Sequence, residues 1–348
     1  MWDNIKNSGR PVVLYGTGNA ADKIIKICEE KNINIAGIFA SDDFVRSRNF
    51  AGYPVISYSE AKRQFGHMTV LLCFGSHIDS VMDNIKRIDY EQDLYAPDLP
   101  IAGDDMFTED YFESNREEFL KAFHLLSDRH SRDVFSGVIN YKLTGRLSYL
   151  TDVESDDEDN YRLFNLGSDE AFIDLGAYNG DTIDFFLKMT GGCYRRIIAF
   201  EPEKRNFRKL NEYCEAKGLK DALLLNAAAS DADKTLYFEK GRGRGSQSGG
   251  IKTVPVDAKS VDNVTASLEG DARISFIKMD LEGMEEEAIR GASQTIKKDK
   301  PKMLISAYHR SSDLFAIPRL VMSLNPGYRV YLRHSPCIPA WEVNYYFV

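Results

Sequence analysis

Short apolar runs alternate with amphipathic segments through the first hundred residues. The apolar runs occur at 11–15, 33–39, 54–56, 70–74 and, more briefly, from residue 94. Segments with helical spacing of apolar residues follow the first and the third of these runs. Strands that alternate with helices favour a parallel sheet with helical crossovers. We therefore expect an α/β unit of Rossmann type in this part of the chain.

The same alternation returns in the second half. Apolar runs that suit buried strands lie at 171–175, 196–200, 222–226, 274–279 and 302–306, with helical segments between them. The chain closes with two further apolar runs, 329–333 and 342–347, joined by a loop that contains proline. Because no helix lies between this last pair, the sequence predicts a second Rossmann-like domain, whose seven-stranded sheet ends in an antiparallel hairpin.

Two helices are predicted between these halves. Apolar residues recur at helical spacing in 107–126, and a second helical segment ends near Gly145. We expect this bridge to pack against the second domain. An acidic run at 152–159 has the composition of a solvated loop. The predicted division is a Rossmann-like, nucleotide-binding-type domain at 1–103, a helical bridge with an acidic linker at 104–160, and a second domain at 161–348.

Composition narrows the classes of function. The chain has 348 residues and a formal net charge of -9, which argues against nucleic acid because phosphate binding needs a basic surface. No apolar run is long enough to cross a membrane, and the N-terminus lacks the basic and apolar segments of a secretory signal. The five cysteines are scattered without metal-ligand spacing, which is typical of free thiols. We expect a cytoplasmic protein without a membrane or nucleic-acid partner; its oligomeric state stays open.

The strand at 171–175 runs into a turn that suits a nucleoside cofactor. Gly176 and Gly180 flank this turn, and a helix opens near Asp181. Glycines let a backbone pass close to a ligand, and a helix start offers free N–H groups. Glu201 follows the next strand, at the place where an α/β sheet holds ribose hydroxyls. The turn and the acid together predict a nucleoside across adjacent strand ends.

The first domain contains a similar turn. Gly16, Gly18 and Ala21 lie between a strand and a helix, and the next strand ends near Asp42 and Asp43. This is the dinucleotide-binding pattern, with alanine in place of the third glycine. The alternative is that these glycines only let the helix pack on the strand. No residues for hydride transfer accompany the turn, so ligand binding here stays open.

Polar residues follow two later strands of the second domain. Asp280 comes directly after the strand at 274–279, and His309 lies shortly after the strand at 302–306. The carboxyl ends of parallel strands are where α/β sheets place ligands and chemistry. Three glutamates at 285–287 open the next helix, where the helix dipole favours acids. We therefore select the first two residues and give the glutamates no functional role.

A segment rich in Gly and Arg at 241–250 has a composition that does not hold regular structure. A short side strand is expected just before it, at 235–239. Because the segment lies between strands of the second sheet, we consider it as a lid over the cleft.

Taken together, these motifs resemble the FkbM-type methyltransferase family over about 171–309. The matching motifs are Phe172-Ile-Asp-Leu-Gly-Ala-Tyr-Asn-Gly-Asp-Thr182, Ala199-Phe-Glu-Pro202, Asn226-Ala-Ala228, Ser260-Val-Asp262, Ile277-Lys-Met-Asp-Leu-Glu-Gly-Met-Glu285 and Gly291-Ala292. Five alternating strands followed by a hairpin also resemble the layout of S-adenosylmethionine-dependent methyltransferases. Many members of the family end the fifth strand in Glu-x-His, whereas this chain has Ala307-Tyr308-His309, so no role of that acid carries over. The first domain resembles, more loosely, the Rossmann-like modules of sugar-modifying proteins.

The resemblance implies methyl transfer from S-adenosylmethionine to a hydroxyl of a small molecule or sugar, with S-adenosylhomocysteine as product. The cofactor-binding residues that it implies are Asp174, Gly176, Tyr178, Asn179, Gly180, Asp181, Thr182, Glu201, Pro202, Asn226, Ala227 and Asp280. Because the acceptor must lose a proton, Asp280 and His309 are the candidate catalytic bases. The alternatives are a helix-capping role for Asp280 and a structural role for His309. No metal is assigned, although Asp280, Glu282 and His309 together have the chemistry to hold a divalent cation.

The sequence leaves two other classes of function open. One is a nucleotide-sugar-related oxidoreductase run by the first domain, which would require NAD(H) to bind at the turn of Gly16. The other is a non-catalytic binding role centred on that domain. The second domain carries several ordered motifs and the first carries one, so we favour the methyltransferase.

Overall fold

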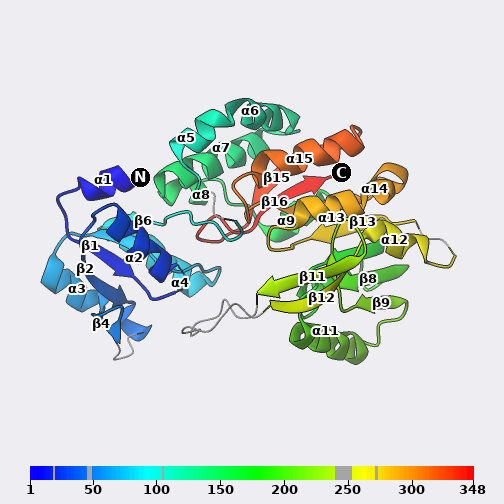
Figure 1. The fold of residues 1–348 in the computed structure, drawn as a ribbon, viewed down its shortest axis with the longest axis horizontal. Coiled ribbons are helices and arrows are strands. Elements are labelled where there is room, and N and C mark those ends of the chain that lie inside the picture. Colours follow the sequence, from blue (N-terminus) through cyan, green and yellow to red (C-terminus); the bar gives the residue numbers. More distant parts are fainter. Residues whose placement is uncertain (19, 45–48, 104–105, 240–252, 271–272) are drawn as a thin grey trace.

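The computed structural model describes residues 1–348 except 19, 45–48, 104–105, 240–252 and 271–272. Within the described residues, the chain forms an α/β molecule with a six-stranded, a three-stranded and a seven-stranded sheet. The two larger sheets lie at opposite ends of the molecule, and helices from the middle of the chain lie along the top of the view (Figure 1). No helix of the described ranges combines the length and the apolar character that a membrane span needs.

The six-stranded sheet is formed by the first hundred residues. Its strands, in spatial order, are β3 (Asn49–Phe50), β4 (Tyr53–Ser57), β2 (Ile35–Ala40), β1 (Val12–Tyr15), β5 (Thr69–Leu72) and β6 (Asp93–Tyr95). All neighbouring strands are parallel except β3 and β4. The helices of this part are α1 (Trp2–Lys6), α2 (Ala21–Glu30), α3 (Tyr58–Phe65) and α4 (Asp79–Glu91), with a short 3₁₀ turn η1 (Asp42–Phe44). This strand order is that of a doubly wound sheet, as the sequence predicted.

The seven-stranded sheet is formed by the second half. Its strands, in spatial order, are β15 (Val330–His334), β16 (Val343–Phe347), β14 (Lys302–Ser306), β13 (Phe276–Met279), β7 (Ala171–Leu175), β8 (Arg196–Phe200) and β9 (Ala222–Leu225). Strand β16 is antiparallel to both of its neighbours, and the other pairs are parallel. The helices of this half are α10 (Asp181–Met189), α11 (Lys204–Lys217), α12 (Val261–Ala266), α13 (Glu285–Gly291), α14 (Ser293–Asp299) and α15 (Asp313–Leu324). The predicted seven-stranded sheet with a terminal hairpin is confirmed.

Continuous burial explains why the central strands read as unbroken apolar runs. All five residues of β7 are buried, as are all four of β13. A parallel sheet that is covered on both faces leaves no solvent-facing side, so alternation of polar and apolar residues disappears. A polar residue in such a strand, such as Asp174 or Lys278, is therefore unusual.

A small sheet flanks the larger one. It consists of β10 (Ala228–Ala229), β12 (Thr253–Lys259) and β11 (Lys234–Glu239), in that order. The side strand expected at 235–239 is confirmed as β11, which pairs antiparallel with β12. The segment 241–250, considered as a lid, lies outside the described residues.

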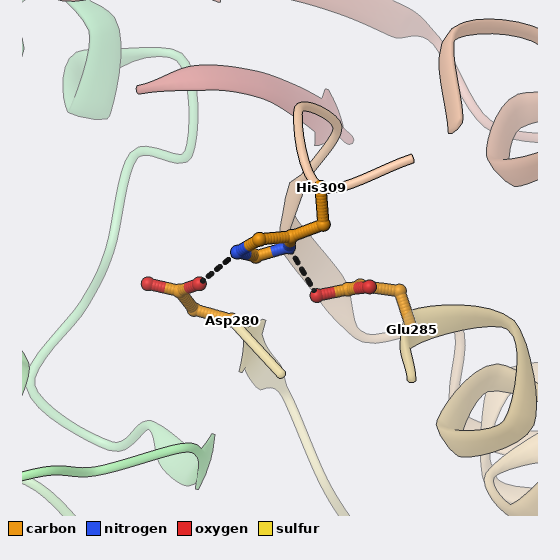
Figure 2. A group of neighbouring side chains, drawn as sticks. All are labelled: Asp280, Glu285 and His309. Carbon is orange, nitrogen blue, oxygen red and sulfur yellow. Dashed lines mark ion pairs between the residues drawn. The ribbon is translucent and has the colours of Figure 1, made fainter. Parts of the chain in front are cut away.

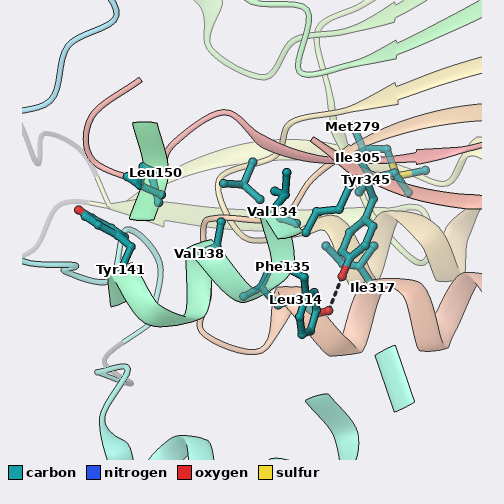
Figure 3. Close-up of a cluster of buried hydrophobic side chains, with 14 of the residues drawn as sticks. Val134, Phe135, Val138, Tyr141, Leu150, Met279, Ile305, Leu314, Ile317 and Tyr345 are labelled. Atoms are coloured by element: carbon teal, nitrogen blue, oxygen red, sulfur yellow. Dashed lines mark hydrogen bonds between the residues drawn. The ribbon is translucent and has the colours of Figure 1, made fainter. Parts of the chain in front are cut away.

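The helical bridge packs against the second half, as expected. It consists of α5 (Glu109–Ser114), α6 (Arg116–Leu125), α7 (Arg129–Thr144), α8 (Ser148–Thr151) and α9 (Asp157–Arg162). Val134, Phe135 and Val138 of α7 belong to one buried cluster with residues of β13, β14, β16 and α15 (Figure 3). In this cluster the hydroxyl of Tyr345 donates a hydrogen bond to the carbonyl of Leu314. Gly145 ends α7 in a left-handed conformation, at the predicted position.

The prediction that the whole acidic run is a solvated loop is wrong for its second part. Residues 157–162 form the short helix α9. The N–H groups of its first turn donate hydrogen bonds to the carboxylate of Asp156. Acids in a first helical turn are favoured by the helix dipole, so the same charges that indicated a solvated loop stabilise a helix start. Charge density alone did not distinguish these two outcomes.

The loop between β15 and β16 connects the two halves of the molecule. Its residue Ile338 exchanges backbone hydrogen bonds of 2.7 and 3.0 Å with Ser76, just beyond β5 of the first sheet. The ring of Trp341 packs directly on Gly75, since a Cβ atom there would lie 2.2 Å from a ring carbon. The hairpin loop therefore covers part of the edge where the strands of the first sheet end.

Candidate cofactor and catalytic site

A cleft of about 1540 Å³ lies at the carboxyl ends of β7, β8, β13 and β14. The predicted residues that line it are Gly176, Tyr178, Asp181, Thr182, Glu201, Pro202, Asn226 and Asp280. They come from four separate segments, which the parallel sheet brings to one edge. The cleft is also lined by residues that were not predicted, among them Asp157, Lys278 and Glu342.

Five predicted residues do not line the cleft. Asp174 is fully buried beneath it, and Gly180 and Ala227 are buried as well. The neighbours Ala228 and Ala229 lie on the cleft wall instead. Asn179 is half-buried, and the side chain of His309 is 1% exposed. These residues can therefore affect ligand binding only by positioning their neighbours, or after a small movement of their side chains or backbone.

Glu201 is held rigidly at the tip of β8. One carboxylate oxygen accepts the N–H of Tyr178 at 2.9 Å, and the other accepts the N–H of Glu203 at 2.8 Å. Burial raises the pKa of the Glu201 carboxyl, and the two N–H donors oppose this shift. Asn226 donates to the carbonyls of Glu201 and Pro202, so it clamps the same strand end. A carboxylate with fixed oxygens and remaining lone pairs suits a pair of hydroxyl donors.

A buried ion-pair chain crosses the floor of the cleft. The ammonium of Lys278 donates to the carbonyl of Gly176 at 3.0 Å and lies 3.7 Å from Asp174 and 3.8 Å from Asp280. Burial alone would lower the pKa of Lys278, but the nearby carboxylates raise it. Burial raises the pKa of Asp174 to about 6, although Lys278 opposes the shift. Neither oxygen of Asp174 has a hydrogen-bond partner among the described residues, which leaves it held by charge alone.

The imidazole of His309 lies between two carboxylates (Figure 2). Its Nε2 atom is 3.4 Å from Asp280 Oδ1, and its Nδ1 atom is 2.9 Å from Glu285 Oε1. Glu285 Oε1 also accepts the N–H of Leu281 at 2.8 Å, and Tyr308 donates to Asp280 Oδ1 at 3.3 Å. Burial alone would lower the pKa of His309, but its carboxylate neighbours raise it to about 9. The ring therefore carries a proton at neutral pH when no other cation lies beside it.

Part of the second half of the chain matches a known protein family. Residues 174–331 match the model of the methyltransferase FkbM domain. The second half of the chain contains an FkbM methyltransferase domain. The crystal structure of methyltransferase FkbM from Methylobacillus flagellatus KT is similar to this chain with a TM-score of 0.75. The two are 22% identical, and the match covers 97% of this chain and 90% of that chain, which shows a shared fold.

More distant structures resemble only part of the chain. An rRNA methylase from Streptococcus thermophilus has a TM-score of 0.37 and 12% identity, covering 54% of this chain and 93% of its own. Fibrillarin from Aeropyrum pernix, solved with natively bound S-adenosyl-L-methionine, has a TM-score of 0.34 and 14% identity, covering 53% of this chain and 69% of its own. No curated protein sequence matches the chain significantly.

Within the FkbM domain, Glu285 is a candidate residue that the sequence analysis did not select. The interpretation that the three glutamates at 285–287 only complement the helix dipole is wrong for the first of them, because its side chain is 1% exposed and faces His309. A signal was present in the sequence. Glu285 precedes Ala288 and Ile289 by three and four residues, and these lie on the buried face of α13. A glutamate on the apolar face of a helix indicates an internal partner.

The glycine turn of the first domain differs from that of the FkbM domain. A Cβ atom on Gly16 would lie 2.4 Å from the ring of Phe74, and one on Gly18 would lie 2.5 Å from the Cβ of Phe74. The carboxylate of Asp42 accepts the backbone N–H and the hydroxyl of Ser59, so it is engaged at the start of α3. Packing against Phe74 thus accounts for both glycines without a ligand, which favours the structural alternative for this turn.

Proposed function

We propose that this chain transfers a methyl group from S-adenosylmethionine to a hydroxyl of a small molecule or sugar. The observation that carries the proposal is the cleft of the FkbM domain, which has Glu201 at the tip of β8 and Asp280 at the tip of β13. As part of the same proposal we keep the division into 1–103, 104–160 and 161–348, with the first domain in a supporting role.

The residues of the cleft fit the nucleoside end of the donor. Glu201 takes the ribose hydroxyls, because its fixed oxygens still have lone pairs to offer. The turn from Gly176 to Thr182 surrounds the methionine end. Asp174 acts from below by holding Lys278, whose ammonium fixes the carbonyl of Gly176. S-adenosylmethionine supplies an electrophilic methyl group on a sulfonium, so positioning and proton removal are what the protein must add.

Asp280 is the base that the geometry favours. Its side chain is 34% exposed and lines the cleft, whereas His309 is buried and holds a proton at neutral pH. As the acceptor oxygen forms its bond to the methyl carbon, the sulfur–carbon bond breaks and its electron pair stays on sulfur. The hydroxyl proton passes to the carboxylate of Asp280. Lys278, Tyr308 and His309 orient that carboxylate from three sides.

The charge of the cleft supports a neutral acceptor. Among the described residues, the acidic side chains that line it are Asp157, Asp181, Glu201, Glu203, Asp257, Asp280, Glu282 and Glu342, against two lysines, Lys204 and Lys278. Such a surface repels the phosphates of a nucleic acid, because anion binding needs an excess of basic groups. A polyhydroxyl molecule without negative charge fits this surface better.

Binding of S-adenosylhomocysteine, measured by calorimetry, tests the proposal. We expect the wild-type chain to bind it and Glu201→Ala to bind it at least about 100-fold more weakly, since hydrogen bonds to a charged group contribute about 1.5–3 kcal/mol each. Glu212→Gln is the matched control, because Glu212 is exposed on α11, where it pairs with Arg208. Absence of binding to the wild-type chain would overturn the proposal, as would equal binding by Glu201→Ala.

A further inference from the structure

We propose that His309, Asp280 and Glu282 bind a divalent cation in the cleft, with Glu285 orienting His309 from the opposite side. The cation would lie beside Nε2 of the imidazole, within reach of both carboxylates. Its catalytic role rests on the proposed methyl transfer, whereas its binding does not.

The distances around Nε2 are close to those of a coordination shell. Nε2 lies 3.4 Å from Asp280 Oδ1 and 3.9 Å from Glu282 Oε2. Ligand atoms that are each about 2.1 Å from one cation lie roughly 3.0 to 3.4 Å apart. The imidazole and Asp280 already have this spacing. The Oε2 atom of Glu282 must move roughly half an ångström closer to Nε2 to reach this spacing. Its side chain is 82% exposed and able to move.

Glu285 completes the arrangement from behind the ring. Its Oε1 atom faces Nδ1 at 2.9 Å, which favours the tautomer with the proton on Nδ1 and the lone pair on Nε2. Metal-bound histidines commonly present their second nitrogen to a carboxylate in this way. Glu285 is itself held by the N–H of Leu281, and its side chain is 1% exposed. A buried carboxylate is costly unless it is paired, and here the imidazole of His309 is its partner.

The negative charges around the imidazole of His309 also favour the binding of a cation. Three carboxylates surround one imidazole, those of Asp280, Glu282 and Glu285. Glu285 Oε2 is buried and has no hydrogen-bond partner within the part of the chain that the structure describes. Lys278 lies 3.8 Å from the other oxygen of Asp280, Oδ2, and the Arg310 side chain donates to the carbonyl of Gly283. A lone pair on Nε2 that faces two carboxylates is stable only with a proton or a metal ion between them.

The donor set indicates the kind of cation. One imidazole with two carboxylates suits Mn²⁺ or Zn²⁺ better than Ca²⁺, which prefers oxygen ligands alone. Two of the three protein ligands, Asp280 and Glu282, line the cleft, so coordination positions on that side are open to water or to an acceptor oxygen. A cation there lowers the pKa of a bound hydroxyl, which is what methyl transfer to oxygen requires.

Calorimetric titration of the full chain with MnCl₂ and with ZnCl₂, after treatment with a chelator, tests the proposal. We expect one ion per chain, bound at least 10-fold more weakly by Asp280→Asn and His309→Gln. Glu285→Gln should weaken binding about 10- to 100-fold, as loss of a partner behind a metal-bound histidine does. Glu286→Gln is the matched control, since Glu286 is the next residue of α13 and pairs with Arg290. Glu282→Gln changes an exposed side chain, so it should fold normally and bind at least 10-fold more weakly.

The outcomes separate this inference from the proposed function. If the wild-type chain binds neither ion, or if Asp280→Asn and Glu282→Gln bind as tightly as the wild type, the inference fails. S-adenosylhomocysteine binding is measured on the same samples. Nucleoside binding without metal binding overturns the cation site alone, and metal binding without nucleoside binding overturns the methyltransferase alone.

Discussion

Gly176 turns the chain out of β7 with a φ of +85°, and its hydrogen atoms face the carbonyl of Asp280. A Cβ atom at this position would lie 2.1 Å from that oxygen. The residue must therefore be glycine for two reasons, its backbone conformation and the close approach of the neighbouring strand end. Both reasons hold without a ligand. The sequence-based reason, approach of the backbone to a cofactor, is a third and separate hypothesis.

The two structural reasons can be separated with a pair of substitutions. Gly191 has a φ of +63° and open space around it, so Gly191→Ala tests the backbone strain alone. We expect Gly191→Ala to lower the free energy of unfolding by about 1–2 kcal/mol. Gly176→Ala should cost about 1–3 kcal/mol more, because the added methyl group also overpacks the strand ends. Urea denaturation measures both, and equal losses would contradict the packing argument.

At the scale of elements, a charged contact joins the start of α7 to the large sheet, in addition to the apolar cluster. The carboxylate of Asp128 accepts the N–H of Ser131 at the start of α7, and the guanidinium of Arg333 on β15 donates to it at 2.6 Å. Arg333 is 7% exposed, so its charge is largely removed from water. Burial would raise the pKa of Asp128, but the contacts with Arg333 and Ser131 lower it to about 2. The carboxylate of Asp128 thus caps α7 and also neutralises the buried charge of Arg333 on β15.

Asp128→Asn separates these two roles, because asparagine also caps helices well. We expect it to reduce the free energy of unfolding at pH 7 by about 1–3 kcal/mol, less than for a fully buried pair because Asp128 is partly exposed. A carboxyl group with a lowered pKa stabilises the folded state above its unfolded pKa of about 3.9 and loses this effect as the pH falls toward 2. The difference between wild type and variant should therefore shrink between pH 4 and pH 2. Denaturation midpoints across this range check it, and a constant difference would exclude a charge effect.

At the scale of the whole molecule, the loop between β15 and β16 serves both halves. Trp341 packs on Gly75 beside the first sheet, and the next residue, Glu342, lines the cleft of the FkbM domain. The N-terminal part of the chain also contacts the site elsewhere, since the N–H of Ala102 donates to the carbonyl of His309 at 3.0 Å. The first domain therefore supports one wall of the cleft, even though its own glycine turn is filled by Phe74.

A substitution at Gly75 should consequently weaken ligand binding in the cleft of the second half of the chain. Gly75→Ala would place a methyl group against the ring of Trp341, and we expect S-adenosylhomocysteine to bind several-fold more weakly as Glu342 shifts. Gly167→Ala is the control, because the nearest atom to its added Cβ is a carboxylate oxygen at 3.9 Å. Calorimetry on the two variants checks this. Unchanged binding by Gly75→Ala would show that the two halves are independent at this wall.

The sequence by itself determined the strands of the two larger sheets, except the short β3, and the edge where the cleft lies. Apolar periodicity reports local burial, and the carboxyl ends of parallel strands share one edge, so Glu201 and Asp280 were both predicted to bind the cofactor at that edge. Tertiary structure alone decided which side chains meet. Glu285 faces His309, Phe74 fills the turn of Gly16, and Trp341 covers Gly75. The first two meetings depend on how a helix or a strand end is rotated toward its neighbour, and the third joins residues more than 260 positions apart, which no local pattern encodes.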